Sequence, residues 1–400
     1  MVRSVSSPRA TTRLLAARKE DCLHRRTAVV GYAEEPLPQC ARTFLERMGK
    51  HAQRYRLYHL CSATSWIIDK VIDNHGGLHN RLTHQIHLMP FTLRECELYM
   101  RASNILLPQK DIAEAYMIMG GIPYYWSYLR RGESLSQNID RIFFSQDAPL
   151  RNEFQALFRS LFKKPDIYIR IVTALTKKRA GLLREQILET TDADDNESFQ
   201  NALKELEECG FIRRYNMLEH KAKNALYQLM DHFTLFHFQY IAANDKQDEH
   251  YWSNMYFSGE HNAWAGLAFE RLCLHHAPQI KQALGISGVI SHLCSWTYKP
   301  TKEEIEQAKK NNKNAGGFQI DLLIDRDDHI INICEMKFAD DEYVMNSEED
   351  RLLRQRISRF VSHTATRKTI HPILVTTYGL SPNGYASVFQ RVITMNDLFA

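Results

Sequence analysis

Two apolar segments in the last quarter of the chain constrain its fold more than any other feature. Residues 318–326 (FQIDLLIDR) and 329–338 (HIINICEMKF) are rich in aliphatic residues, and Asp327 and Asp328 separate them. This pattern predicts two strands joined by a short turn. Apolar residues at almost every position further predict strands that are buried on both faces of a sheet.

Three of the charged side chains in these strands belong to Asp321, Glu335 and Lys337. Successive side chains of a strand point to opposite faces, so Glu335 and Lys337 share one face. Alternation places the Asp321 side chain on the opposite face of its strand from Ile320, unless the regular pleat is broken at this point. We therefore expect Asp321, Glu335 and Lys337 to converge on one point of the sheet.

This combination suits metal-assisted chemistry on phosphates. Carboxylates such as Asp321 and Glu335 are ligands that Mg²⁺ prefers, and a lysine can orient a bound water or stabilise charge on a phosphate. Glu270, in the preceding helical segment, is a candidate fourth acid. The alternative is a solvated sheet face on which the same residues form cross-strand ion pairs.

The surrounding segments favour the first interpretation. A helix is predicted over residues 263–284, strand material over 286–298, a basic amphipathic helix over 351–364 and an apolar strand over 371–380. With the hairpin, these elements predict an α/β sandwich in a domain of residues 246–400. The order of acidic helix, Asp strand, E-x-K strand and basic helix resembles the PD-(D/E)xK nucleases, whose fold is restriction-endonuclease-like.

The middle of the chain is predicted to be helical. Thr92 and Glu95 have the spacing of a capping box, which begins a bundle over residues 93–160. A stop at Gly120-Gly121, with Pro123 just beyond, ends one of its helices. The aromatic residues of the bundle are expected to form its core rather than a platform for stacking bases.

Residues 161–245 predict a winged helix followed by a linker helix. Three helical patterns precede two short strands with a basic turn, which is the winged-helix order. In a DNA-binding interpretation, basic residues of the wing contact phosphates; they are Arg213, Arg214, Lys221 and Lys223. The alternative is a connector between domains, which four glutamates in the third helix favour because they would repel phosphates.

Size and charge set wider limits. A chain of 400 residues predicts two or three domains, and a net charge of +4 is too small to identify a nucleic-acid-binding protein. The eight cysteines lack the spacing of a zinc site. No apolar run is long enough for a membrane helix, and the basic start lacks a signal-peptide core. We expect a cytoplasmic protein without a membrane partner.

The stretch from Cys61 to Ala400 resembles the archaeal-type ATPases, which join an AAA-type P-loop core, a helical lid, a winged helix and a PD-(D/E)xK-like domain. The resemblance is carried by CSATSWIIDKVIDNHGGLHNRLT, GGIPYYW, GFIRRY, YQLMDHF, AWAGLAFERLC, FQIDLLIDR and NICEMKF. It implies a multidomain chain of α/β and α parts: a remnant of the ATPase core (61–92), a lid (93–160), a winged helix with linker helix (161–245) and a nuclease-like domain (246–400). It also implies Glu270, Asp321, Glu335 and Lys337 as the nuclease-like site, and Arg81 as a nucleotide-sensing arginine for ATP.

The ATPase core departs from that family pattern. Phosphate binding needs a Walker A loop, G-x-x-x-x-G-K-[ST], and a strand that ends in acids for Mg²⁺. The 400 residues contain no such loop, since Gly49-Lys50 is followed by His51 and lacks the upstream glycine. We expect an incomplete ATPase that neither binds nor hydrolyses ATP.

Residues 1–60 show no strand or helix period, and we expect them to be non-native. Back-translation of Lys19–Arg26, read from the second base of each codon, permits KKIVFIDE, an apolar strand ending in the two acids of a Walker B site. The same frame permits a loop and an amphipathic helix up to His51. We therefore expect a frameshifted and truncated ATPase core, which sequencing of the coding DNA tests.

Two functions follow as expectations. The first is a protein without ATPase activity that retains a metal-binding, nuclease-like domain acting on DNA. The second is a non-catalytic module that binds DNA or a protein partner through its winged helix and basic helix.

Overall fold

The computed structural model describes residues 27–30, 56–59, 88–215, 218, 225–244, 248–298, 300–310 and 316–400. The chain divides into two compact units, Met1–Leu88 and Met89–Ala400. In the first unit, β1 (Thr27–Val30) pairs in parallel with β2 (Arg56–His59). Arg81, the remainder of the segment expected to be frameshifted, and residues 61–87 of the expected ATPase remnant lie outside the described residues.

The second unit begins with the expected run of helices. Its members are α5 (Leu93–Ala102), α6 (Gln109–Met119), α7 (Pro123–Trp126), α8 (Leu135–Ile139), the π-helix η3 (Asp140–Phe144) and α9 (Glu153–Leu161). The predicted capping box at the start of α5 is confirmed: the Thr92 amide donates to Glu95 Oε2 (2.8 Å), and the Glu95 amide donates to Thr92 Oγ1 (3.3 Å). The aromatic side chains are core as predicted, except for Tyr124, which is half exposed.

The two glycines after α6 have different physical roles. Gly120 has φ 63° and ψ −166°, a backbone conformation that essentially only glycine adopts. Gly121 lies against the backbone of Phe91, whose amide donates to the Gly121 carbonyl (2.7 Å). A Cβ atom at Gly121 would lie 2.0 Å from the Phe91 carbonyl oxygen. The first glycine permits the turn and the second permits the close approach.

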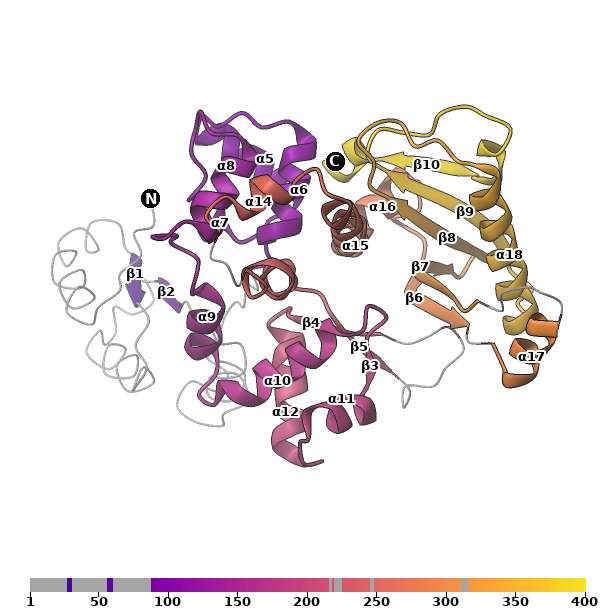
Figure 1. Ribbon diagram of the computed structural model, residues 1–400, viewed down its shortest axis with the longest axis horizontal. Coiled ribbons are helices and arrows are strands. Elements are labelled where there is room, and N and C mark those ends of the chain that lie inside the picture. Colours follow the sequence, from indigo (N-terminus) through magenta and orange to yellow (C-terminus); the bar gives the residue numbers. More distant parts are fainter. Residues whose placement is uncertain are drawn as a thin grey trace. The chain divides into compact units, whose positions relative to one another are not determined.

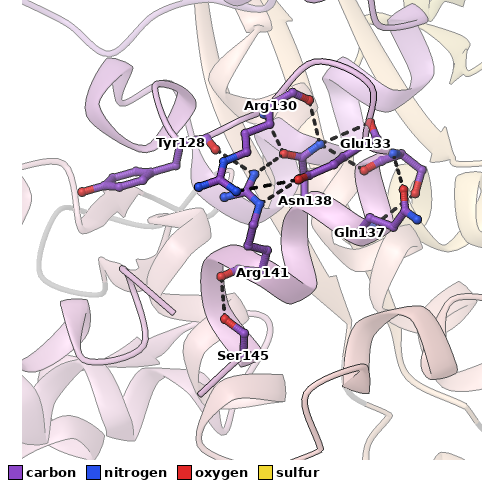
Figure 2. Close-up of polar contacts among 8 residues, drawn as sticks. Tyr128, Arg130, Glu133, Gln137, Asn138, Arg141 and Ser145 are labelled. Carbon is purple, nitrogen blue, oxygen red and sulfur yellow. Dashed lines mark hydrogen bonds and ion pairs between the residues drawn. The ribbon is translucent and has the colours of Figure 1, made fainter. Parts of the chain in front are cut away.

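A buried asparagine holds the turn before α8 (Figure 2). Asn138 Oδ1 accepts from the Arg130 amide (2.7 Å) and from Arg141 Nη2 (2.6 Å), and Asn138 Nδ2 donates to three backbone carbonyls. Arg141 Nε also donates to Glu133 Oε2 (2.8 Å). Since every polar atom of the buried amide has a partner, the network fixes the turn without an unsatisfied group.

Residues 165–229 form three helices and a small sheet. These elements are α10 (Pro165–Thr176), β3 (Leu182–Leu183), α11 (Arg184–Thr191), α12 (Glu197–Glu208), β4 (Ile212–Tyr215) and β5 (Leu226–Leu229). Strands β4 and β5 form the expected hairpin, and β3 adds to the free edge of β5. The loop between α10 and β3 brings Arg179 toward the C-terminal sheet, where it meets Glu270 and Asp321.

The expected linker helix is present. It contains α13 (His232–Phe236), the π-helix η5 (His237–Ile241) and α14 (Tyr251–Met255). The single long helix predicted over residues 263–284 is wrong. Two helices, α15 (Gly259–His275) and α16 (Ala277–Ala283), meet at His276. Pro278 explains the break because proline lacks an amide and its ring clashes with the carbonyl four residues earlier.

The C-terminal part is a mixed five-stranded sheet between helices (Figure 1). Its strand order is β10-β9-β8-β7-β6, with β8, β9 and β10 parallel and β6, β7 and β8 antiparallel. The strands are β6 (Ser291–Tyr298), β7 (Phe318–Arg326), β8 (Ile330–Lys337), β9 (Thr369–Thr376) and β10 (Arg391–Thr394). Helices α17 (Lys302–Lys310), α18 (Ser347–Thr364), η6 (Ala386–Val388) and α19 (Met395–Leu398) complete this mixed α/β part.

Each face of the sheet packs against a different helix. Cys334 and Met336 belong to the same apolar cluster as Phe269 of α15. Ile333 of the same strand belongs to a second cluster, together with Phe360 of α18. The predicted burial of both faces is therefore confirmed. Within the described ranges, no helix combines the length and apolar composition that a membrane span requires.

His276, at the break between α15 and α16, joins the helical run to the C-terminal part. The side chain is 1% exposed. Its Nε2 atom accepts from the Leu93 amide at the start of α5 (3.0 Å), so its Nδ1 atom carries the proton that it donates to the Leu272 carbonyl (2.9 Å). Burial lowers the pKa of His276 to about 4.

We expect this histidine to destabilise the protein in acid. Between pH 6.5 and 4 the imidazole takes up a proton in the unfolded chain but not in the folded chain, so the free energy of unfolding falls as the pH falls. At 1.36 kcal/mol per pKa unit, the loss from His276 reaches about 3 kcal/mol near pH 4. Urea unfolding at pH 7.5 and 4.5 measures it. His276→Gln keeps a donor and an acceptor but does not titrate, so an equal pH effect in this variant would contradict the prediction.

Candidate active site

The predicted hairpin forms as expected. Strands β7 and β8 pair from Leu322↔Cys334 to Asp325↔Ile331, and Asp327-Asp328 makes the turn between them. Cys334 and Met336 face α15, so alternation turns Glu335 and Lys337 toward α18. The contact between Glu335 and Arg356 of α18 agrees with this orientation.

The alternation expected in β7 is broken at Asp321. Strand β6 pairs Cys294 with Leu323 and Trp296 with Ile320, so two β7 residues lie opposite the single β6 residue Ser295. Ile320 and Leu323, three positions apart, accordingly belong to the same apolar cluster. Such a β-bulge changes the direction of a side chain. Simple alternation therefore does not describe the position of Asp321.

All four predicted site residues line one cavity of about 280 Å³. Glu270 comes from α15, Asp321 from the bulge of β7, and Glu335 and Lys337 from the end of β8. The cavity also has three polar side chains that the sequence did not indicate, namely Arg179, Gln319 and Arg356. It is therefore lined by three acids and three cations.

The acids fall into two groups, each held by different cations. Arg179 Nη2 donates to Glu270 Oε1 and also to Asp321 Oδ2 (3.2 Å), and it bridges the two carboxylates. Gln319 Nε2 donates to the other oxygen of Asp321 (2.5 Å).

Glu335 forms the second group. It lies between Arg356 Nη1 (2.5 Å) and Lys337 Nζ (3.2 Å). Each carboxylate of the cavity thus has a positive partner.

Glu270 is nevertheless incompletely compensated. Its side chain is 13% exposed, and its Oε2 atom is buried without a hydrogen-bond partner. Burial, and then the neighbouring charge of Asp321, raise the pKa of Glu270 to about 7, although Arg179 opposes this shift. The single positive charge of Arg179 therefore does not fully neutralise the carboxylates of Glu270 and Asp321.

This donor set fits a hard divalent cation in its chemistry but not in its present arrangement. Carboxylate oxygens are the ligands that Mg²⁺ prefers, and the unpartnered Glu270 oxygen offers one. However, the described residues contain no group of three or more His, Cys, Asp or Glu side chains placed to hold a metal ion. Glu270 and Asp321 form a pair of carboxylates, with the Arg179 guanidinium between them.

No local pattern in the sequence indicates Arg179 or Arg356 as site residues. Arg179 lies 91 and 142 residues before its two partners and follows two lysines of the same charge. Arg356 was predicted only as one member of a basic helix. Arg356 follows Glu335 by 21 residues, and a loop separates the two. No helix or strand periodicity therefore relates their positions.

Among the described residues, Arg213 and the arginines of α18, which were expected to meet nucleic acid, contact other groups of the chain. Arg213 donates to Gln228 (2.7 Å) and lies over the ring of Tyr215. The arginines of α18 pair with acids, as in Arg351–Glu348, Arg354–Asp350, Arg356–Glu335 and Arg359–Glu304. Lys221 and Lys223 lie outside the described residues. The Arg213 contacts favour the connector interpretation of this segment.

Comparisons of the chain with family models, with curated proteins and with solved structures found no match.

Proposed function

We propose that the C-terminal part of this protein hydrolyses phosphodiester bonds in nucleic acid, with DNA as the first substrate to test, and that it does so with Mg²⁺. The observation that carries the proposal is the cavity lined jointly by Glu270, Asp321, Glu335 and Lys337. Acids from a helix and from two strands meet there beside a lysine, which is the set of groups that metal-assisted hydrolysis uses. A solvated sheet face would not explain the contribution of Glu270.

In this proposal the carboxylates of Glu270, Asp321 and Glu335 would hold the ion. When bound, Mg²⁺ lowers the pKa of a coordinated water and offsets charge on the phosphate. The Lys337 ammonium would donate a hydrogen bond to the attacking water or to a phosphate oxygen. Arg356 holds the Glu335 side chain near the C-terminal end of β8, and Gln319 orients the Asp321 side chain.

The remainder of the chain has a supporting role in this proposal. The segment 165–229 acts as a connector, because Arg213 is engaged by Gln228 and Tyr215. ATP hydrolysis is not part of the function, since the 400 residues contain no Walker A loop. The alternative of a non-catalytic binding module receives less support, because Arg351, Arg354 and Arg359 of α18 each pair with an acidic residue of the chain.

The test uses the full chain and three substrates: plasmid DNA, single-stranded DNA and RNA. We expect cleavage with Mg²⁺ or Mn²⁺ that co-elutes with the protein and stops when the metal is chelated. The substrate that is cut identifies the nucleic acid. Absence of metal-dependent cleavage of all three, with saturable binding to one of them, would support the binding module instead.

A further inference from the structure

Arg179 is the least expected residue of the cavity. A single guanidinium nitrogen contacts one oxygen of Glu270 and one oxygen of Asp321. A positive group between two carboxylates occupies the position that a divalent cation shared by them would need. Both would use the same carboxylate oxygens.

The backbone that carries Arg179 is firmly held. Its carbonyl accepts from Gln228 Nε2 (2.7 Å) and from Arg271 Nη2 (2.7 Å), and so it is tied to β5 and to α15. Two residues later, Gly181 has φ +83°, and a Cβ atom there would lie 2.3 Å from the Tyr227 carbonyl oxygen. The loop therefore presents the arginine to the site from a fixed point.

The side chain is freer than its backbone. It is 44% exposed, whereas the side chains of Glu270 and Asp321 are 13% and 12% exposed. A partly exposed ion pair contributes little to stability, because water solvates the guanidinium almost as well. The arginine can thus leave for solvent by rotation about its own bonds while the loop stays in place.

We propose that Arg179 is a built-in competitor for the metal ion: it closes the Glu270–Asp321 pair in the metal-free protein and withdraws when a divalent cation binds. The inference rests on the proposed function, because it concerns the metal of that site. The loop from Lys177 to Gly181 thereby sets how easily the C-terminal part is loaded with metal, and any ligand that draws Arg179 away favours loading.

Competition has a measurable consequence. The apparent dissociation constant equals the intrinsic one divided by the fraction of molecules in which the arginine is withdrawn. We expect Arg179→Gln to bind Mn²⁺ on the order of tenfold more tightly than the wild type, and Arg179→Lys to lie between them. Free Mn²⁺ is followed by electron paramagnetic resonance in the full chain, without nucleic acid.

Lys178→Ala is the matched control. It removes the same charge from the same loop, and within the described part of the chain the Lys178 side chain has no hydrogen bond or ion pair. We expect its Mn²⁺ affinity to equal that of the wild type. The double variant Glu270→Gln with Asp321→Asn should lose the tight binding, which assigns the ion to this pair.

Thermal unfolding gives a second readout that does not depend on cleavage. With chelator, Arg179→Gln should unfold at a temperature close to that of the wild type, because the partly exposed ion pair contributes little to stability. Added Mn²⁺ should raise the midpoint of the variant more than that of the wild type.

The outcomes separate the two proposals. Equal or weaker Mn²⁺ binding by Arg179→Gln overturns the competition and leaves the metal site standing. No saturable binding by either protein overturns both. Tenfold tighter binding by Arg179→Gln, with no change in Lys178→Ala, supports the competitor.

Discussion

Replacement of Glu335 by alanine is expected to lower the rate of metal-dependent cleavage by about 100- to 1,000-fold, which is the effect of removing one preorganised group that stabilises the transition state. Glu335 lines the cavity and is fixed by both Lys337 and Arg356. Its loss removes a ligand oxygen and also releases the two cations that it orients. The measurement is the cleavage rate of the full-length variant at saturating Mg²⁺.

Glu342→Ala is a suitable control because Glu342 is an exposed acid that follows the same strand and does not line the cavity. It should cleave like the wild type. Lys337→Met removes the lysine while keeping the three acids, so it should lose cleavage and retain Mn²⁺ binding. Cleavage by Glu335→Ala at the wild-type rate would contradict the proposed site.

Gly121→Ala is expected to lower the free energy of unfolding by about 3 kcal/mol, at the upper end of the range for overpacking. The new methyl group would lie 2.0 Å from the Phe91 carbonyl oxygen and 2.7 Å from the Phe91 nitrogen. Because these are backbone atoms, no rotamer change relieves the clash. The two backbone segments would have to move apart, and the hydrogen bond from the Phe91 amide to the Gly121 carbonyl would be lost.

The same substitution elsewhere should have the opposite sign. Gly266 lies inside α15, and a Cβ atom there meets nothing within 4 Å. Gly266→Ala is therefore expected to stabilise the protein by about 1 kcal/mol through helix propensity. Urea unfolding of both variants measures the contrast. Similar free energies of unfolding for the two variants would show that close packing at Gly121 is not what selects glycine there.

Local chemistry explains which features the sequence could predict. The hairpin follows from strand composition and an Asp-Asp turn, and the start of α5 follows from the Thr92–Glu95 capping box. The shared face of Glu335 and Lys337 follows from their spacing alone. Each of these depends on residues that are close in sequence.

Features that depend on distant packing could not be predicted. Arg179 reaches the cavity because the α10–β3 loop is tied to β5 through Gln228 and to α15 through Arg271. The bulge at Asp321 depends on how β7 pairs with β6, and a single strand does not encode it. The break at His276 is different, because Pro278 was visible in the sequence and is sufficient to divide the helix.

The bulge also shows how Asp321 relates to the rest of β7. Without this residue, Ile320 and Leu323 would face α18 and Leu322 and Ile324 would face α15 in unbroken alternation, opposite the same β6 partners. The apolar pattern of the strand is thus complete without the acid, which behaves as a one-residue insertion. A strand one residue shorter would pair with β6 without a bulge. The extra residue in β7 therefore places a carboxylate in the cavity and adds nothing to the apolar core.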